Sequence, residues 1–203
     1  MRVVGGRWRG RRLVAPAGQP VRPTTDRVKE ALFNILGDAV ADAVVLDLCC
    51  GSGGLGIEAL SRGAAEVVFV DRAARSLDHA GRNLAACRAD PGTYRLVRAH
   101  AVTWLAGWLR ATRRPARWYL LADPPYQSDV GEAILSLLAG APDLSGLAAA
   151  VLERATDEDR VPPAPDGWTR DRRAYGGSEL VILRPGDPGP ERQPRPAKGW
   201  NAS

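Results

Sequence analysis

The sequence predicts an α/β fold with a mostly parallel sheet that ends in an antiparallel hairpin. Short apolar runs alternate with stretches of helical periodicity from about residue 44 to residue 153. A glycine-rich loop follows the first of these runs, between a strand and a helix. Residues 168–183 alternate around Gly176 and Gly177, which is typical of a hairpin. Strands that alternate with helices indicate a sheet with helices on both faces.

Each element follows from its own local pattern. A helix is predicted over about residues 25–40, because Thr24, Thr25 and Asp26 provide capping side chains and an acid before apolar residues at helical spacing. Apolar runs predict strands at residues 44–49, 66–71, 94–99, 118–122 and 148–153. Helical periodicity predicts helices at residues 55–62, 73–86, 102–109 and 131–138.

The two ends of the chain differ from this alternating middle. Residues 1–23 are rich in Gly, Pro and Arg, and we expect a basic arm of loop with at most a short strand around residues 11–15. Residues 185–203 contain five prolines and little that is apolar, so we expect a disordered tail. The folded domain is therefore assigned to residues 24–184.

The net charge of +5 at pH 7 is concentrated in the arm, because residues 1–25 hold six arginines and no acidic residue. One interpretation is a solvated basic tail. The other is a segment that contacts phosphates, which clustered arginines bind well. On the second interpretation the contacting residues are Arg7, Arg9, Arg11, Arg12 and Arg22.

The rest of the composition argues against several classes of protein. Cys49, Cys50 and Cys87 are odd in number and two are adjacent, so no disulfide framework is expected. No Cys or His spacing resembles a zinc site, and we expect no metal. No apolar run reaches the roughly 20 residues of a membrane span, and the N-terminus lacks a signal-peptide core. We expect a cytoplasmic monomer.

The first predicted strand runs into Gly51, Gly53 and Gly56, which have the Gly-x-Gly-x-x-Gly spacing of an adenosine-cofactor loop. Asp71 ends the second strand, where an acid can bind ribose hydroxyls. This pattern fits NAD, S-adenosylmethionine or a tight turn without a ligand. Asp47 lies four residues before the first glycine and favours S-adenosylmethionine, because a carboxylate repels a pyrophosphate but accepts hydrogen bonds from an ammonium group.

Asp123, Pro124, Pro125 and Tyr126 directly follow the fourth predicted strand. Ligands of an open parallel sheet bind beyond the carboxyl ends of the strands, so this loop and the glycine loop share one edge. Asp123 and the Pro124 carbonyl can accept hydrogen bonds from an exocyclic amine of a base and free its lone pair. The two prolines stiffen the loop, and Tyr126 can stack on the base. The alternative is an ordinary Pro-Pro turn.

Taken together, these residues resemble the RsmD family of 16S rRNA guanine-N2 methyltransferases. The resemblance includes the glycine loop, the Asp-Pro-Pro-Tyr loop and two N-terminal stretches, residues 5–12 and 22–34, and it extends over about residues 1–184. It implies a Rossmann-like class I methyltransferase fold with seven strands and S-adenosylmethionine as the cofactor. It also implies that the substrate is 16S rRNA within the small ribosomal subunit, and that the arm contacts RNA.

The resemblance also implies roles for particular residues. It places Asp47 and the glycines at the methionine part of the cofactor, Asp71 at the ribose, and the stretch around His100 near the adenine. The cofactor contacts that it implies are Asp47, Gly51, Ser52, Gly53, Asp71, Arg72, His100 and Ala101. Cys49 and Cys50 depart from the family, which usually has an aromatic and a small residue there, and His100 stands where a small polar residue is common.

Three other functions use parts of the same pattern. An adenine-N6 methyltransferase needs the same four-residue loop, but the chain has no additional target-recognition domain. A non-catalytic RNA-binding module needs only the arm, but the acids Asp47, Asp71 and Asp123 are all present. A nicotinamide-dependent oxidoreductase needs the glycine loop, but Asp47 argues against a pyrophosphate. The residues therefore favour an amino-methyltransferase, and the resemblance to the RsmD family implies guanine N2 as its target.

Overall fold

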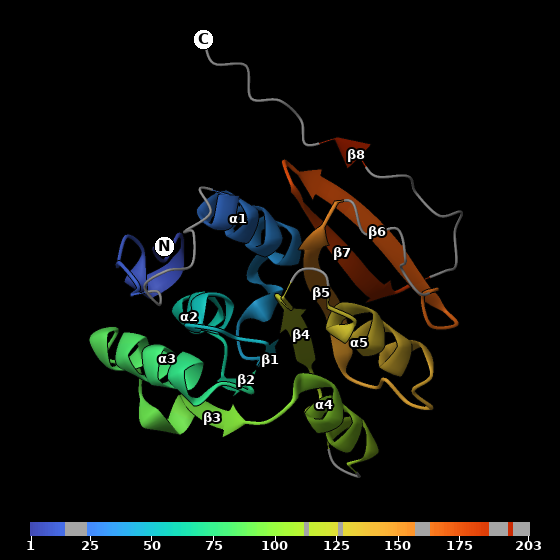
Figure 1. The fold of residues 1–203 in the computed structure, drawn as a ribbon, viewed down its shortest axis with the longest axis horizontal. Helices are drawn as coiled ribbons and strands as arrows, with labels where there is room; N and C mark the ends of the chain where they lie inside the picture. Colours follow the sequence, from blue (N-terminus) through green and yellow to red (C-terminus); the bar gives the residue numbers. More distant parts are fainter. Residues whose placement is uncertain (15–23, 112–113, 126–127, 157–162, 187–194, 197–203) are drawn as a thin grey trace.

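The computed structural model describes residues 1–14, 24–111, 114–125, 128–156, 163–186 and 195–196. It confirms the predicted α/β fold, with strands and helices that alternate through the first two thirds of the chain (Figure 1). The strands are β1 Val44–Leu48, β2 Glu66–Asp71, β3 Tyr94–Arg98, β4 Trp118–Ala122, β5 Leu147–Ala155, β6 Trp168–Tyr175, β7 Ser178–Pro185 and β8 Arg195–Pro196. The helices are α1 Thr24–Leu36, α2 Gly54–Ser61, α3 Ala74–Ala86, α4 Ala101–Arg110 and α5 Val130–Ala139.

The strands form one sheet in the order β3-β2-β1-β4-β5-β7-β6-β8. The first five strands of the chain pair in parallel, and β7 runs antiparallel to both β5 and β6. The seven expected strands are therefore present, and the two-residue strand β8 pairs in parallel with β6 as an eighth. The order reverses between β1 and β4, which makes the carboxyl ends of these two strands the expected place for a ligand.

Two hydrophobic cores lie on opposite faces of the sheet. On one face, Phe33 of α1, Leu60 of α2 and Leu84 of α3 pack with the side chains of alternate strand positions. On the other face, Leu105 of α4 and Leu138 of α5 pack against the strand side chains that point the opposite way. This alternation is the period of two that strands impose, and it explains why β1, β2 and β4 are apolar at nearly every position.

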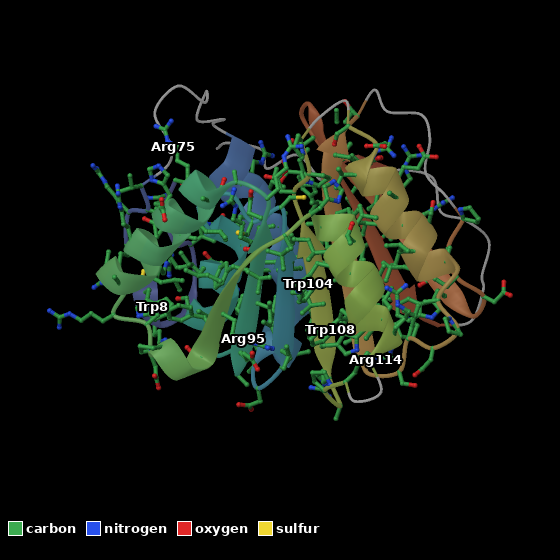
Figure 2. All side chains as sticks on the ribbon, turned by 60° about the horizontal axis from the view of Figure 1, so that its bottom comes forward. Trp8, Arg75, Arg95, Trp104, Trp108 and Arg114 are labelled. Atoms are coloured by element: carbon green, nitrogen blue, oxygen red, sulfur yellow. The ribbon has the colours of Figure 1, made fainter. Side chains whose placement is uncertain are left out.

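Trp118 anchors the second core as a fully buried side chain on β4. The ring of Trp108 meets the Trp118 ring edge-on at 6.1 Å between centroids, and Trp104 stacks on Trp108 at 5.5 Å. Trp104 and Trp108 are one helical turn apart on α4, where Figure 2 shows them side by side. The three rings hold α4 against the sheet. Helix α4 begins at Ala101, just after the carboxyl end of β3.

Helix α1 ends earlier than its periodicity predicts. The α-helical segment stops at Leu36, and residues Gly37–Val40 form a short 3₁₀ turn. Gly37 has φ of +63°, a left-handed conformation that glycine adopts at little cost and that closes helices. The expectation of helix up to residue 40 was therefore wrong by one turn.

The N-terminal residues do not form the loose arm that their composition suggests. Residues 1–4 and 10–14 run antiparallel, with an isolated β-bridge between Arg2 and Arg12 instead of the expected strand at 11–15. Val3 and Leu13 are buried in the first core, so the segment is part of the folded domain. Figure 1 shows it beside α2. Residues 15–23, which complete the predicted arm, lie outside the described residues.

Strand β3 is an edge strand of the sheet. It is more exposed than β1, β2 and β4. Arg95, Leu96 and Arg98 are exposed along it, and Arg95 pairs with Glu66 of the neighbouring β2 at 2.6 Å. At the C-terminal end of the chain, the predicted disordered tail lies outside the described residues except for Pro185, Gly186 and the two residues of β8.

Candidate cofactor and methyl-transfer site

The predicted site residues meet at the carboxyl edge of the sheet. Leu48 at the end of β1 pairs in register with Ala122 of β4 and with Val70 of β2. The loops that follow β1, β2 and β4 therefore start side by side at the carboxyl ends of the strands. A hydrogen bond of 3.4 Å from the Asp123 amide to the Leu48 carbonyl joins the β4 loop to β1. Loops from three strands thus converge at the point where the strand order reverses.

The glycine loop between β1 and α2 turns sharply. Cys49, Gly51 and Gly53 have positive φ values of 55°, 54° and 83°. Gly53 is the N-cap of α2, and a Cβ there would approach three side-chain atoms at 3.2 Å. A left-handed backbone and close packing both require glycine at this position. Cys49 adopts the same left-handed region, which is uncommon for a residue with a side chain.

Asp47 is buried on β1 and is hydrogen-bonded to the end of the glycine loop. Its Oδ2 accepts a 2.8 Å hydrogen bond from the backbone N–H of Gly56, in the first turn of α2. Burial removes the carboxylate from water and raises its pKa from 3.8 to about 8, although the Gly56 hydrogen bond opposes this shift. The nearby charges of Asp123 and Asp71 raise the pKa further.

Asp71 at the end of β2 also bonds to the backbone. Its Oδ2 accepts from the Gly51 N–H at 2.9 Å, and its Oδ1 accepts from the Ala73 N–H at 2.9 Å. These bonds fix the orientation of a half-buried carboxylate, which retains further lone pairs for hydroxyl groups. The position suits the predicted hydrogen bonds to ribose hydroxyls.

The same hydrogen bonds bear on the choice between a dinucleotide and S-adenosylmethionine. A pyrophosphate is normally held by the free N–H groups of a glycine loop and of the helix that follows it. Here the Gly51 and Gly56 N–H groups already bond to Asp71 and Asp47. Carboxylates stand where phosphates would need donors, so the site suits a cationic ligand and disfavours NAD. The ammonium and sulfonium groups of S-adenosylmethionine are positively charged and fit these carboxylate acceptors.

The described residues that directly follow β4 are Asp123, Pro124 and Pro125. Asp123 is exposed, Pro124 is buried and Pro125 is exposed. The Ser128 hydroxyl donates a 2.6 Å hydrogen bond to the Pro125 carbonyl. Tyr126 lies outside the described residues, so its predicted stacking role stays a prediction.

The two cysteines of the glycine loop are unreactive. Burial and the charges of Asp71, Asp47 and Asp123 raise the pKa of the half-buried Cys49 thiol to about 12. Burial also raises the pKa of Cys50. The thiolate is the reactive form of cysteine, and these raised pKa values disfavour it at both positions. They fill space beside the loop.

The residues expected near the adenine lie at the start of α4. His100 is the exposed N-cap residue of α4, and Ala101 is buried behind it. The Ala99 N–H donates to the Asp71 carbonyl at 3.1 Å, which brings this stretch next to the ribose-binding candidate. Arg72 is exposed beside Asp71. The geometry therefore groups all the described candidate cofactor residues along one edge.

The N-terminal segment is anchored by a buried carboxylate, Glu58 of α2. Its Oε2 accepts from the Val4 N–H at 2.8 Å, and its Oε1 accepts from the Gly5 N–H at 2.7 Å. Lys29 and Arg62 form ion pairs with the same carboxylate at 3.5 and 2.9 Å. Both oxygens are saturated, which makes this buried charge tolerable.

A second anchor lies one turn further along α2. The Ser61 hydroxyl donates to the Gly5 carbonyl at 2.6 Å and accepts from the Trp8 N–H at 2.9 Å. A Cβ at Gly6, whose φ is +70°, would lie 2.0 Å from the Ser61 carbonyl oxygen. Only glycine fits this approach, which explains the Gly-Gly pair at the tip of the segment.

The anchored segment presents its arginines to solvent. Arg7, Arg9, Arg11 and Arg12 are all exposed. Arg7 lies over the Trp8 ring at 4.3 Å, and Arg11 donates to the Ala86 carbonyl at the end of α3. Arg22 lies outside the described residues. The structure thus holds four of the five predicted RNA-contacting arginines on a fixed base instead of a loose arm.

Comparison with known proteins agrees with this geometry. A family model described as Conserved hypothetical protein 95 matches residues 1–184. The chain belongs to this family, the RsmD family. It is 35% identical to Ribosomal RNA small subunit methyltransferase D of Escherichia coli, over 90% of this chain and 88% of that protein. It is 31% identical to the protein of the same name from Haemophilus influenzae, over 83% of this chain and 85% of that one.

Solved structures show the same fold. The Escherichia coli methyltransferase yhhF superimposes with a TM-score of 0.74 at 33% identity, covering 92% of this chain and 98% of that chain. This RsmD-family chain therefore has the Rossmann-like methyltransferase fold that its motifs implied.

Several site residues of this RsmD-family chain escaped the sequence analysis. Glu58 and Asn83 are charged or polar residues at buried helical positions, and that mismatch with the apolar stripe was the available signal. Ser128, which closes the β4 loop, carries no such signal. Across the ranges that the structure describes, no helix has the length and apolar character needed to cross a membrane. Nor do three or more His, Cys, Asp or Glu residues gather there as a metal site would require.

Proposed function

We propose that this protein transfers a methyl group from S-adenosylmethionine to the exocyclic N2 amine of a guanine in 16S rRNA of the small ribosomal subunit. The observation that carries the proposal is the convergence of Asp123 with Asp47 and Asp71 at the edge of the sheet. The names of the Escherichia coli and Haemophilus influenzae relatives support ribosomal RNA of the small subunit as the substrate. The guanine-N2 position comes from the motif resemblance.

The cofactor would supply a methyl group on a positively charged sulfur, which is an electrophile. Asp47 would accept hydrogen bonds from its ammonium group, and Asp71 would accept them from its ribose hydroxyls. Backbone of Gly51, Ser52 and Gly53 would line the methionine part. Burial, and to a smaller extent the charges of Asp123 and Asp71, disfavour the ionised form of Asp47, and a cationic ligand would favour it.

The β4 loop would prepare the nucleophile. The lone pair of a guanine N2 amine is delocalised into the ring, so the amine is a weak nucleophile. Asp123 and the Pro124 carbonyl would accept its two N–H hydrogens and favour a tetrahedral nitrogen with a free lone pair. The loop is held in shape before substrate binding, since Pro124 is buried and Ser128 bonds to the Pro125 carbonyl.

Transfer would join the amine nitrogen to the methyl carbon and leave the electron pair of the broken carbon–sulfur bond on sulfur, while Asp123 and the Pro124 carbonyl would hold the amine. The amine then carries one proton too many, which passes to Asp123 or to water. Alignment of the two reactants supplies much of the rate enhancement in such a step. The base would need to leave its stack to reach the loop.

The arginines of the N-terminal segment would bind RNA phosphates near the target. The segment lies against α2 and α3, on the helix face that begins at the glycine loop. The proposal is a cytoplasmic enzyme that acts as a monomer on an assembled or assembling subunit.

Methyl transfer from labelled S-adenosylmethionine tests the proposal. The acceptors are unmodified small ribosomal subunits, free 16S rRNA and duplex DNA, with mass spectrometry of the product nucleosides. N2-methylguanine in the small-subunit RNA is the expected result. N6-methyladenine would overturn guanine as the target base but would still support methyl transfer to an exocyclic amine. Absence of transfer to every acceptor would refute the proposed function.

A further inference from the structure

Asn83 of α3 joins the N-terminal segment to the glycine loop. Its Nδ2 donates to the Val14 carbonyl and to the Ser52 carbonyl, each at 2.9 Å. Its Oδ1 accepts from the Val14 N–H at 2.8 Å. The side chain is 1% exposed, so these partners replace water entirely. One amide thus ties the arginine-bearing segment to the loop expected to hold the cofactor.

The amide is well suited to this link. It accepts one hydrogen bond and donates two within a single plane, and these three bonds satisfy both of its N–H groups. Aspartate in its place could accept from Val14 but would turn an oxygen towards the carbonyls of Val14 and Ser52. An unsatisfied or repelled group at this depth is costly, so the link is specific for a side-chain amide.

A second connection joins the same two parts. The Met1 side chain packs on Gly54, the first residue of α2, where a Cβ would lie 2.6 Å from the Met1 Sδ. Met1 is in turn hydrogen-bonded through its carbonyl to the Leu13 N–H at 3.0 Å. The segment therefore touches the glycine loop on both sides of Gly53, at Ser52 through Asn83 and at Gly54 directly.

The arginines sit on the same short stretch. Arg11 and Arg12 immediately precede Leu13 and Val14, and Arg12 takes part in the β-bridge with Arg2. RNA bound to these arginines would restrain the strand that bonds to Asn83. Restraint at Val14 reaches the Ser52 carbonyl through one side chain, without passing through a mobile linker.

We propose that Asn83 is a positioning residue that couples RNA binding at the N-terminal segment to cofactor binding at the glycine loop. This inference rests on the proposed function. Each ligand raises the affinity for the other, because each restrains one of the two segments that Asn83 ties together. Thermodynamic linkage makes the factor the same in both directions.

The test measures the affinity for S-adenosylhomocysteine, the demethylated product, by calorimetry with and without saturating unmodified small subunits. Its use prevents turnover during titration. In the wild-type chain, the subunit raises this affinity by roughly fivefold or more, the lower end of typical coupling. Asn83→Asp brings the factor to within about twofold of one.

Two further variants separate coupling from folding and from charge. Asn34→Asp makes the same chemical change at an exposed position of α1 and keeps the full coupling factor. Val14→Pro removes the N–H that bonds to Asn83 Oδ1, while the bond from Asn83 to Ser52 remains. Because Val14 is 60% exposed, we expect this variant to fold even where Asn83→Asp does not. The bond from Asn83 to the Val14 carbonyl also remains, so this variant lowers the coupling factor and keeps its affinity for S-adenosylhomocysteine without RNA.

The outcomes are distinct. Coupling in the wild type that Val14→Pro lowers, that Asn83→Asp removes and that Asn34→Asp keeps supports the inference. Methyl transfer with no effect of the subunit on S-adenosylhomocysteine affinity, or with coupling intact in Val14→Pro, overturns the inference and leaves the proposed function standing. Failure of the wild type to bind S-adenosylhomocysteine at all refutes the proposed function, and the inference falls with it.

Discussion

The Gly56 N–H donates its hydrogen bond to Oδ2 of Asp47, a carboxyl group that is 1% exposed. The bond spans nine residues and closes the glycine loop between β1 and α2. Loop shape and the charge state of Asp47 are therefore linked. A neutral Asp47 still accepts this bond, whereas an ionised one must also overcome burial and the repulsion of two neighbouring carboxylates.

Asp47→Asn should stabilise the protein at alkaline pH. Burial raises the pKa of Asp47 from 3.8 to about 8, so between these values the folded state holds a proton that the unfolded state has lost. Stability therefore falls as pH rises through this window, by at most about 1.4 kcal/mol per pH unit, and levels off above pH 8. Asparagine keeps an acceptor for Gly56 and removes this loss.

Thermal unfolding at pH 5, 7 and 9 measures the effect. The gain of Asp47→Asn over the wild type should grow up to pH 8, while its affinity for S-adenosylhomocysteine falls by about tenfold or more, as for a lost charged hydrogen bond. Asp38→Asn makes the same change at an exposed site and should be neutral. A gain that does not depend on pH would contradict the role of ionisation.

Asp123→Ala should remove methyl transfer without removing cofactor binding. The variant loses the carboxylate that we propose as an acceptor for the amine, and losses of single preorganised groups of this kind reduce kcat by about 10²–10³. Single-turnover transfer to small subunits gives the rate, and calorimetry with S-adenosylhomocysteine gives the binding. Asp129→Ala changes an exposed carboxyl at the start of α5 and serves as the matched control. Equal rates in the two variants would exclude Asp123 from the chemistry.

Glu58→Gln should destabilise the fold through the N-terminal segment. One amide nitrogen would face either Val4 N–H or Gly5 N–H, and Lys29 would lose its carboxylate while buried. Breaking a buried pair in this way costs about 3–5 kcal/mol. Denaturant unfolding measures the loss, and Lys29→Met in the same chain should recover part of it. No recovery would show that Lys29 is not the source of the cost.

Arg7→Ala with Arg9→Ala should weaken RNA binding and flatten its salt dependence. Each phosphate contact that is lost reduces the slope of log affinity against log salt by about 0.7–0.9. Arg110→Ala with Arg117→Ala removes the same amount of charge at two exposed positions. Arg110 is the last residue of α4 and Arg117 directly precedes β4, so this pair should leave the slope unchanged. Filter binding at several salt concentrations compares the pairs. Equal slopes for both pairs would mean that only net charge matters.

Local pattern was enough to predict most elements. Strands β2 and β4 begin and end at the predicted residues, because continuous apolar runs bounded by polar residues mark buried strands. The glycine loop was recognisable for the same reason, since its spacing is contiguous in sequence. The end of α1 was not, because Gly37 interrupts a periodicity that continues to Val40.

The docking of the N-terminal segment could not be predicted from local pattern. Glu58 meets Val4 and Gly5 across more than fifty residues, and neither partner's backbone N–H has a sequence signature. The predicted arm was read from charge alone, which describes the exposed arginines and misses the buried Val3 and Leu13. The chemical roles of Asp47, Asp71 and Asp123 remain predictions that the geometry supports.

The arginines along β3 also bear on how the molecule behaves at high concentration. An edge strand offers unpaired backbone groups to any other strand, and open edges of this kind seed aggregation. Arg95 and Arg98 line this edge. Arg95 is paired with Glu66, so two copies that met there would bring their Arg98 side chains together. This contact between like charges disfavours self-assembly through β3.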